Sequence, residues 1–151
     1  MKDVLTNKRA LHDYQVLEKF EAGLVLGGPE VKSIKNSRAD LKGAYISINT
    51  KGEPTILNFY IAPYPQAKRE QTNYEPERPR KLLLNKKEIN YLTQKQKEKG
   101  LTIMPVSVYI KNKLVKMQIG VCKGKRKADK REDIKKRDAD RKMRRAMKQR
   151  M

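Results

Sequence analysis

The sequence predicts a mainly β fold with two or three flanking helices and a basic C-terminal tail. Several segments are rich in β-branched and aromatic residues, as strands are, and clusters of turn residues separate them. Two further segments carry signals for the start of a helix. The number and length of the strands suit a small closed β-barrel of the oligonucleotide-binding type, with an open α+β sheet as the alternative.

The N-terminal part predicts one strand and one short helix. Residues 1–13 are polar and basic, and we expect them to be only partly ordered. A strand follows over residues 14–20 and can extend to 26, although Leu17 breaks its alternation of apolar and polar side chains. Pro29 suits the first turn of the helix that comes next, where Glu30 lies near the positive end of the helix dipole.

The middle of the chain predicts a hairpin and a long connection. Residues 44–48 and 55–61 are the expected strands, and residues 49–52 form the turn between them. Residues 62–81 hold four of the seven prolines and many charges. Connections of this length are usually mobile or functional.

The last structured part predicts a helix and two strands. Asn85 and Glu88 match an Asn-x-x-Glu form of the capping box, which places the start of a helix after Asn85. Strands are expected over residues 101–110 and 114–121. Pro105 within the first of these indicates an edge position or a bulge.

Charge is the strongest functional signal in the sequence. The chain has 37 Lys and Arg against 17 Asp and Glu, a formal net charge of +20. Such a charge favours a polyanionic partner, nucleic acid first and an anionic membrane surface second. No apolar run approaches the roughly 18 residues that a spanning helix needs, and no signal peptide is recognisable. With a single cysteine, which cannot form an internal disulfide, these features predict a cytoplasmic protein without membrane contact.

The tail carries half of the excess charge. Residues 122–151 contain 15 Lys or Arg and 5 Asp or Glu, a net of +10 out of +20. We therefore divide the chain into a β domain at 1–122, which we expect to bind the polyanion, and a basic tail at 123–151, which has too little apolar content to fold alone. Methionines four residues apart in the tail suggest a helix that forms on a partner. The alternative is a merely solvated charged segment.

No catalytic constellation is visible. His12 has no nucleophilic partner in any known motif, and Cys122 is best interpreted as a strand-end residue despite the lysines beside it. Residues 120–127 lack the spacing of a phosphate-binding loop. No Cys/His set has the spacing of zinc ligands. We expect no enzyme activity, no metal and no cofactor.

Aromatic residues offer candidates for stacking on nucleic-acid bases. Tyr64 and Tyr74 lie in the proline-rich connection and are the better candidates. Packing in the core or at its rim is the expected role of Tyr45 and Tyr60.

Short motifs along nearly the whole chain resemble the bacterial SsrA-binding protein family, also called small protein B. Seven stretches occur in the family's order: Asn7-Lys8-Arg9-Ala10, Phe20-Glu21-Ala22-Gly23-Leu24, Glu30-Val31-Lys32-Ser33, Arg80-Lys81-Leu82-Leu83-Leu84-Asn85, Ile119-Gly120-Val121, Lys123-Gly124-Lys125-Arg126, and Asp129-Lys130-Arg131 with Ile134-Lys135. The resemblance implies an oligonucleotide-binding-like barrel with flanking helices, monomeric when free. It also implies an adaptor that binds the tRNA-like part of transfer-messenger RNA and delivers it to stalled 70S ribosomes for trans-translation, while the tail enters the small-subunit decoding centre and the mRNA path as a helix.

The resemblance also implies the roles of individual residues. The RNA-binding positions are Lys8, Arg9, Glu30, Lys32, Leu83, Asn85, Lys116, Lys123, Lys125 and Arg126, and the tail positions at the decoding centre and beyond it are Asp129, Lys130, Arg131 and Met147. The residues by themselves leave alternatives: Leu83 as core, Asn85 as a helix cap, and Glu30 as a partner of the helix dipole. Two positions depart from the family pattern, Ala128, where a ring is common, and Pro29.

Two other classes of protein compete with the adaptor. One is a ribosomal protein held permanently in rRNA by its tail. The other is an RNA-processing enzyme, which would need a cluster of carboxylates or a pair of histidines that the sequence does not display.

Overall fold

The computed structural model describes residues 3–67, 73–125 and 141. Its strands are β1 (Asp3–Thr6), β2 (Tyr14–Leu24), β3 (Ala39–Asp40), β4 (Tyr45–Ile48), β5 (Pro54–Leu57), β6 (Tyr60–Ile61), β7 (Arg80–Leu83), β8 (Leu101–Lys111) and β9 (Leu114–Gly124). The α-helices of this part are α1 (Lys8–Asp13), α2 (Gly28–Lys35) and α3 (Lys86–Lys97), and a 3-10 turn spans Pro65–Ala67. The chain is therefore mainly β with helices, as the sequence predicts.

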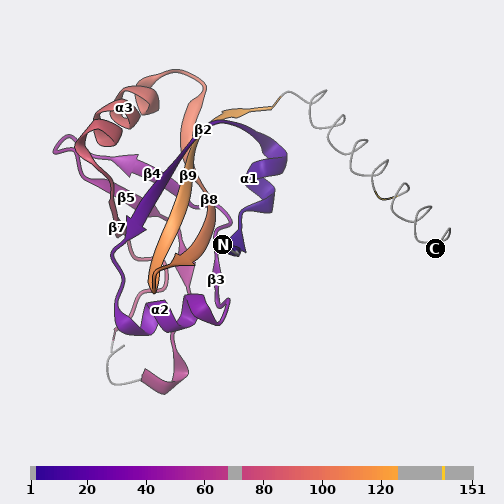
Figure 1. Ribbon diagram of the computed structural model, residues 1–151, viewed down its shortest axis with the longest axis vertical. Helices are drawn as coiled ribbons and strands as arrows, with labels where there is room; N and C mark the ends of the chain where they lie inside the picture. The colour runs from indigo at the N-terminus through magenta and orange to yellow at the C-terminus, as the bar shows by residue number, and fades with distance from the viewer. Residues whose placement is uncertain (1–2, 68–72, 126–140, 142–151) are drawn as a thin grey trace.

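The strands form one curled antiparallel sheet and a small accessory pair (Figure 1). The order in the seven-stranded sheet is β1-β8-β9-β2-β7-β5-β4, and β3 pairs with β6 in a second sheet. Bulges at Leu17 in β2 and Val106 in β8 increase the local coiling of the long strands. As a result β4 comes to lie beside β8. Within the described residues, the end strands β1 and β4 are nevertheless not paired, so hydrogen bonds there do not close the predicted barrel.

The N-terminal segment is ordered by one asparagine, and the expectation of partial order for residues 1–13 is wrong for the described residues 3–13. Asn7 is 4% exposed. Its backbone N–H donates to the carbonyl of Val106 at 2.8 Å, its Nδ2 donates to the carbonyl of Pro105 at 2.9 Å, and its Oδ1 accepts from the N–H of Ala10 at 3.2 Å. One side chain thus caps α1 and ties β1 and α1 to the bulge of β8.

The predicted strand and helix after residue 13 are confirmed. The bulge of β2 explains the broken alternation, because the extra residue there, Leu17, is 46% exposed. β2 ends at Leu24 instead of continuing to residue 26. In α2, Pro29 lies in the first turn, as expected for a residue without a backbone N–H.

The hairpin is confirmed for β4 and β5, but the predicted second strand over residues 55–61 is not continuous. Asn58 has a φ of 59°, and this left-handed turn ends β5 and redirects the chain into β6, which pairs with β3. The connection predicted up to residue 81 is also too long. Residues 80–83 form β7, which pairs with β2 and with β5 in the middle of the sheet. The sequence pattern did not indicate this strand because its first residue is the buried Arg80, and arginine is seldom buried.

The last helix and the last two strands are confirmed. Asn85 caps α3: its Oδ1 accepts from the N–H of Glu88 at 2.8 Å, and the Glu88 carboxylate accepts from the N–H of Asn85 at 3.2 Å. Pro105 lies at the bulge of β8. Asn112 and Lys113 both have positive φ, the turn geometry that matches the twist of a hairpin, between β8 and β9.

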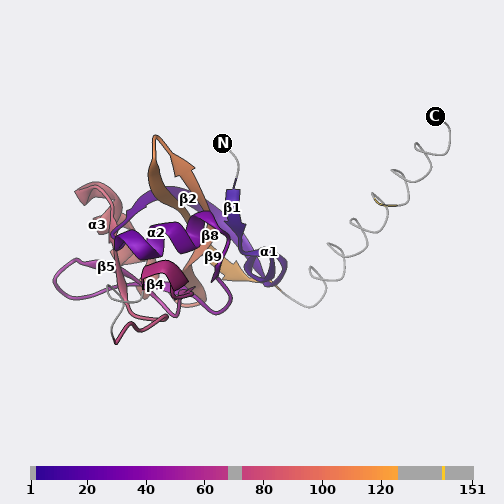
Figure 2. The same ribbon diagram turned by 90° about the horizontal axis from the view of Figure 1, so that it is seen from below.

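The inner face of the curled sheet holds the core, and the helices cover its openings. Ile56, Phe59, Met117 and Ile119 are fully buried there, and Leu92 of α3 joins them. Viewed from below, α2 crosses the end of the sheet, while α1 and α3 lie on opposite sides of it (Figure 2).

Candidate nucleic-acid interface

An exposed leucine and a lysine lie on either side of a glycine on the outer face of the sheet. Gly23 of β2 pairs with Leu83 of β7 on one side and with Lys116 of β9 on the other. A Cβ at Gly23 would lie 3.3 Å from the Cβ of Leu83 and 3.6 Å from the Nζ of Lys116. Leu83 is 62% exposed, so its interpretation as a core residue is wrong. An apolar side chain beside an ammonium group suits a nucleotide, whose sugar or base packs while its phosphate pairs.

The same face continues into a polar group that the sequence did not reveal. The hydroxyl of Tyr109 donates to Glu21 Oε2 at 2.5 Å, and the Nζ of Lys111 lies 3.5 Å from the same oxygen. The hydrogen bond from Tyr109 lowers the pKa of Glu21, and Lys111 and Lys116 act in the same direction. Glu21 is therefore an ionised acceptor on an otherwise basic protein.

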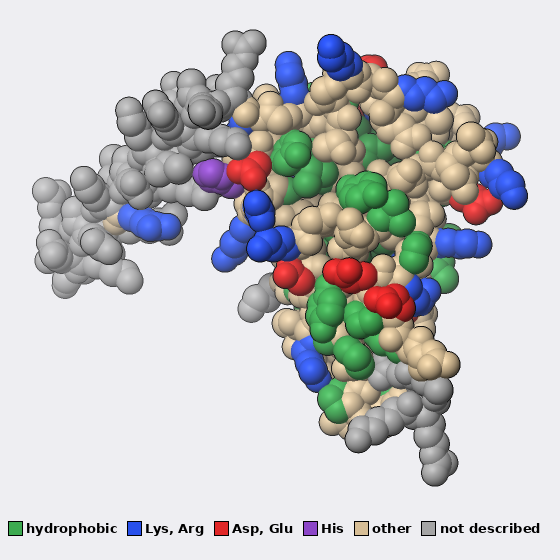
Figure 3. All heavy atoms as spheres, turned by 180° about the vertical axis from the view of Figure 1, so that it is seen from behind, with side chains coloured by type: hydrophobic (Ala, Val, Ile, Leu, Met, Phe, Trp, Pro, Cys, Tyr) green, Lys and Arg blue, Asp and Glu red, His purple; other side chains and the backbone are tan. Residues whose placement is uncertain are grey.

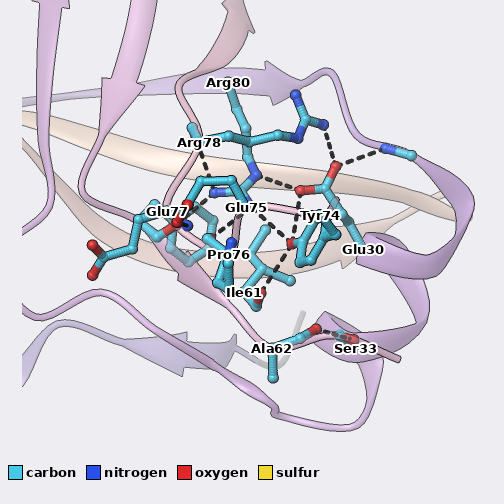
Figure 4. Close-up of polar contacts among 12 residues, drawn as sticks. Glu30, Ser33, Ile61, Ala62, Tyr74, Glu75, Pro76, Glu77, Arg78 and Arg80 are labelled. Carbon is cyan, nitrogen blue, oxygen red and sulfur yellow. Dashed lines mark hydrogen bonds and ion pairs between the residues drawn. The ribbon is translucent and has the colours of Figure 1, made fainter. Parts of the chain in front are cut away.

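Glu30 is the centre of a buried ion-pair network at the N-terminus of α2 (Figure 4). The carboxylate is 3% exposed, and both of its oxygens are occupied. Oε1 accepts from the backbone N–H of Gly27 at 3.0 Å and from Arg78 Nη2, while Oε2 accepts from Arg80 Nε at 2.5 Å and lies 3.2 Å from the hydroxyl of Tyr74. The hydrogen bonds hold α2 against the segment that leads into β7.

Hydrogen bonding decides the charge of Glu30. Burial alone raises the pKa of this carboxyl, but the bonds from Gly27, Arg78 and Arg80 outweigh burial and leave the pKa below its ordinary value. The side chain of Arg80 is fully buried and also donates to the carbonyls of Phe59 and Pro76. Glu30 is thus an internal partner of two arginines, which is a larger role than that of a partner of the helix dipole.

Tyr74 does not have the environment expected of a residue that stacks on bases, whereas Tyr45 and Tyr60 lie where they are expected. The hydroxyl of Tyr74 donates to the carbonyl of Ile61 at 2.9 Å and accepts from Arg80 at 2.9 Å, so this side chain belongs to the network around Glu30. The Nζ of Lys32, an exposed residue of α2, lies 5.4 Å from the centroid of the Tyr64 ring. Tyr45 and Tyr60 are 41% and 40% exposed and thus lie at the rim.

Asn85 has the helix-capping role that the sequence predicts, and the cap uses the oxygen of its side-chain amide but not the nitrogen. Its Oδ1 is occupied by the N–H of Glu88. Its Nδ2 donates no hydrogen bond within the part of the chain that the structure describes, and the residue is exposed. The cap therefore leaves a donor directed to solvent two residues after Leu83.

A second basic group lies at the other end of β9. Lys123 is an exposed residue near the end of this strand, and Lys125 connects to α1, because its N–H donates to the carbonyl of Asp13 at 2.9 Å and its Nζ to that of Leu11 at 3.2 Å. The exposed Lys8 and Arg9 belong to the same helix. A cavity of about 480 Å³ adjoins this group, lined among others by Arg9, Asp13, Tyr14 and Lys42.

The structure therefore separates the predicted contacts into groups. Lys116 and Lys123 are seven residues apart on β9, about 23 Å along a strand and on opposite faces of it. Figure 3 shows one face of the molecule, with Lys and Arg side chains around its margin and hydrophobic and acidic side chains nearer its middle. Arg126, Ala128, Asp129, Lys130, Arg131 and Met147 lie outside the described residues.

His12 and Cys122, the residues whose side chains could take part in catalysis, have ordinary structural surroundings. His12 Nδ1 lies 2.9 Å from a carboxylate oxygen of Asp13. Cys122 is fully buried, and burial raises its pKa to about 11. Among the residues described, no three His, Cys, Asp or Glu side chains gather as metal ligands. None of the helices in this part of the chain is both long and apolar enough to cross a membrane.

Comparison with known proteins gives one consistent family. The model of the SmpB protein family matches residues 4–149. The SsrA-binding protein of Geobacillus kaustophilus is 48% identical over 149 residues, which cover 99% of this chain and 94% of that protein. The SsrA-binding protein of Listeria monocytogenes serovar 1/2a is also 48% identical, over 99% of this chain and 95% of that one.

A solved structure gives the same result for the fold. It is described as "tmRNA-SmpB: a journey to the center of the bacterial ribosome", and its matching chain superposes with a TM-score of 0.67 at 40% sequence identity. The match covers 86% of this chain and 93% of that chain.

Proposed function

The chain belongs to the SmpB protein family, and from this membership we propose that it is the RNA-binding adaptor of trans-translation. It binds the tRNA-like part of transfer-messenger RNA and delivers it to stalled ribosomes, where peptide tagging then proceeds. The observation that carries the proposal is 48% identity to SsrA-binding proteins over 99% of the chain. Peptidyl transfer and the resumed translation belong to the ribosome, so this chain catalyses no step and acts in the cytoplasm.

The geometry supports a division of labour between faces of the β domain. The outer surface of Leu83, Gly23 and Lys116 offers apolar packing and a cation to a folded RNA, with the Nδ2 of Asn85 and the ammonium group of Lys32 as further contacts. Glu30 contributes by fixing α2 through Arg78 and Arg80. In its fold, the approach of β4 to β8 supports an oligonucleotide-binding-like barrel.

The basic end of the β domain and the tail complete the proposal. Lys8, Arg9, Lys123 and Lys125 form a second cationic group where β9 ends. We assign Arg126 to the RNA contacts, Asp129, Lys130 and Arg131 to the decoding centre, and Met147 to a helix in the mRNA path. The free protein is a monomer, with the β domain and the tail as separate functional units.

Removal of the tail tests this division. Because β9 runs to Gly124, the test removes only residues 126–151 of the tail, and a protein ending at Lys125 keeps β9 and its contacts with α1. It should bind the tRNA-like RNA with nearly the affinity of the full chain and support no tagging of peptides on stalled ribosomes. Circular dichroism of the shortened protein controls for folding. Normal tagging by the shortened protein, or loss of RNA binding by a folded one, would contradict the assignment.

A further inference from the structure

A small polar cavity opens on the outer face of the sheet next to Lys116. Its volume is about 330 Å³, within the range of ligand pockets, and its lining residues are Asp3, Glu21, Ser107, Tyr109 and Gln118. The strand register accounts for this grouping. Gln118 of β9 pairs with Ser107 on one side and Glu21 on the other, and in the neighbouring row Tyr109 pairs with both Lys116 and Asp3.

Two polar side chains in this cavity lack partners within the described part of the chain. Ser107 is 3% exposed, and its hydroxyl makes no hydrogen bond there. The side-chain amide of Gln118 makes none either. A buried hydroxyl without a partner carries a free-energy cost, so such groups usually have a ligand or water. Ser107 therefore indicates an occupant of the cavity independently of the carboxylates.

The chemistry of the lining selects hydrogen-bond donors. Glu21 is ionised and only accepts, and Asp3 adds a second carboxylate. The hydroxyl of Tyr109 already donates its hydrogen bond to Glu21, so it has no proton left to donate to a ligand. A phosphate would be repelled by this lining, whereas the imino and amino N–H groups on the edge of a guanine match it, since carboxylates accept such bonds from bases.

The surroundings of the cavity distinguish a nucleotide from other donors. Lys111 and Lys116 lie beside the carboxylate of Glu21. They would repel an arginine side chain of a protein partner, but would attract the phosphates on either side of an inserted base. The surface of Leu83 and Gly23 begins directly beyond Lys116.

We propose that the cavity of Glu21, Ser107 and Gln118 is a subsite for one unpaired guanine of the bound RNA. Glu21 accepts from the base edge, Ser107 and Gln118 complete the hydrogen bonds, and Lys116 pairs with an adjacent phosphate. The inference rests on the proposed function, because it supplies the base recognition that the cationic contacts lack. It gives a basic RNA-binding surface one position at which the identity of the base matters.

Base recognition and simple charge attraction predict opposite effects of Glu21→Gln on RNA affinity. If RNA binding depends on charge alone, removing a negative charge from the surface strengthens it. If Glu21 binds a base, the loss of a hydrogen bond to a charged group weakens it by about tenfold to a hundredfold. Glu53→Gln is the matched control, because the exposed side chain of Glu53 makes no hydrogen bond within the described residues. It should leave affinity unchanged or slightly increased.

Ser107→Ala separates recognition from folding. Because the hydroxyl has no partner in the described protein, its removal should not lower the melting temperature, while RNA affinity falls several-fold. Full-length variants are titrated with the tRNA-like RNA at fixed salt, and each dissociation constant is divided by that of the parent protein. Preference of the parent for this RNA over other RNAs tests the proposed function separately, so failure of one does not imply failure of the other.

Substitutions in the RNA provide the most direct test of this subsite. Each unpaired guanosine of the tRNA-like RNA is replaced in turn by inosine, which lacks the 2-amino group. One replacement should weaken binding of the parent protein and have little effect on Glu21→Gln, because the same bond has already been lost. The inference is overturned if Glu21→Gln binds this RNA as tightly as the parent, or if every inosine affects both proteins equally. Loss of ribosome binding alone in Glu21→Gln would instead assign the cavity to a protein side chain and also overturn it.

Discussion

Replacement of Glu30 by glutamine tests the buried network at α2. The substitution keeps the shape of the side chain and removes the charge that pairs with Arg80, whose side chain is fully buried. Loss of one partner from a buried ion pair costs about 3–5 kcal/mol, because the remaining charge stays in a poorly solvated site. That is a large share of the roughly 5–15 kcal/mol of a typical domain and corresponds to a fall in melting temperature of about 10–20 °C.

The assay is unfolding in urea followed by circular dichroism, since the chain has no tryptophan to report by fluorescence. The matched control is Glu98→Gln, which removes an ion pair to Lys95 at the surface and should have little effect on stability, because solvent screens such pairs. A loss below 1 kcal/mol for Glu30→Gln would refute the reasoning, because the carboxylate would then not compensate the buried guanidinium of Arg80.

The same variant predicts a dependence on pH. The pKa of Glu30 is lower in the folded protein than in the unfolded chain, so its contribution to stability is full above the unfolded value of about 4.3 and is lost as pH falls through the folded value. The difference in stability between the parent and Glu30→Gln should therefore be largest near pH 7 and shrink toward pH 3. A difference that does not change with pH would contradict the assigned charge.

Three further predictions concern single positions. Gly120→Ala should lower the free energy of unfolding by about 1–3 kcal/mol, measured in urea, because its Cβ would lie 2.9 Å from a methyl carbon of Val16. The thiol of Cys122 should not react with Ellman's reagent at pH 7.5 until urea unfolds the protein, because burial raises its pKa to about 11; fast reaction in the native protein would be inconsistent with this. Asn85→Ala should cost about 1 kcal/mol of stability through loss of the cap, whereas Asn85→Ser keeps the cap and should lower only RNA affinity, by titration; equal affinity for serine would leave Asn85 as a cap alone.

Features that depend on neighbouring residues could be predicted from the sequence. The capping box of Asn85 and Glu88 is complete within four residues, and the helix α3 follows as expected. Leu17 departs from the alternation of apolar and polar side chains because it is the extra residue of a β-bulge. The sequence pattern therefore indicated even this irregularity of the strand.

Features that depend on distant partners could not be predicted. β7 was missed because the charge of Arg80 is compensated by Glu30, fifty residues earlier in the chain. β1 and α1 were missed because the bonds that order them run from Asn7 to the bulge of β8. The arrangement of residues on the outer surface could not be predicted for the same reason. Family resemblance indicated Leu83 and Lys116, but only strand register brings them to either side of Gly23 and places Glu21 and Ser107 beside them.

The measurement that tests the central claim most directly is a binding competition at physiological salt. The tRNA-like part of transfer-messenger RNA is labelled, bound to the full chain and challenged with excess ordinary tRNA or duplex RNA of matched length. The complex should survive both competitors, and its affinity should fall steeply with added salt because several phosphates are neutralised. Equal displacement by every RNA would contradict the adaptor role and leave a basic protein without preference for its proposed partner.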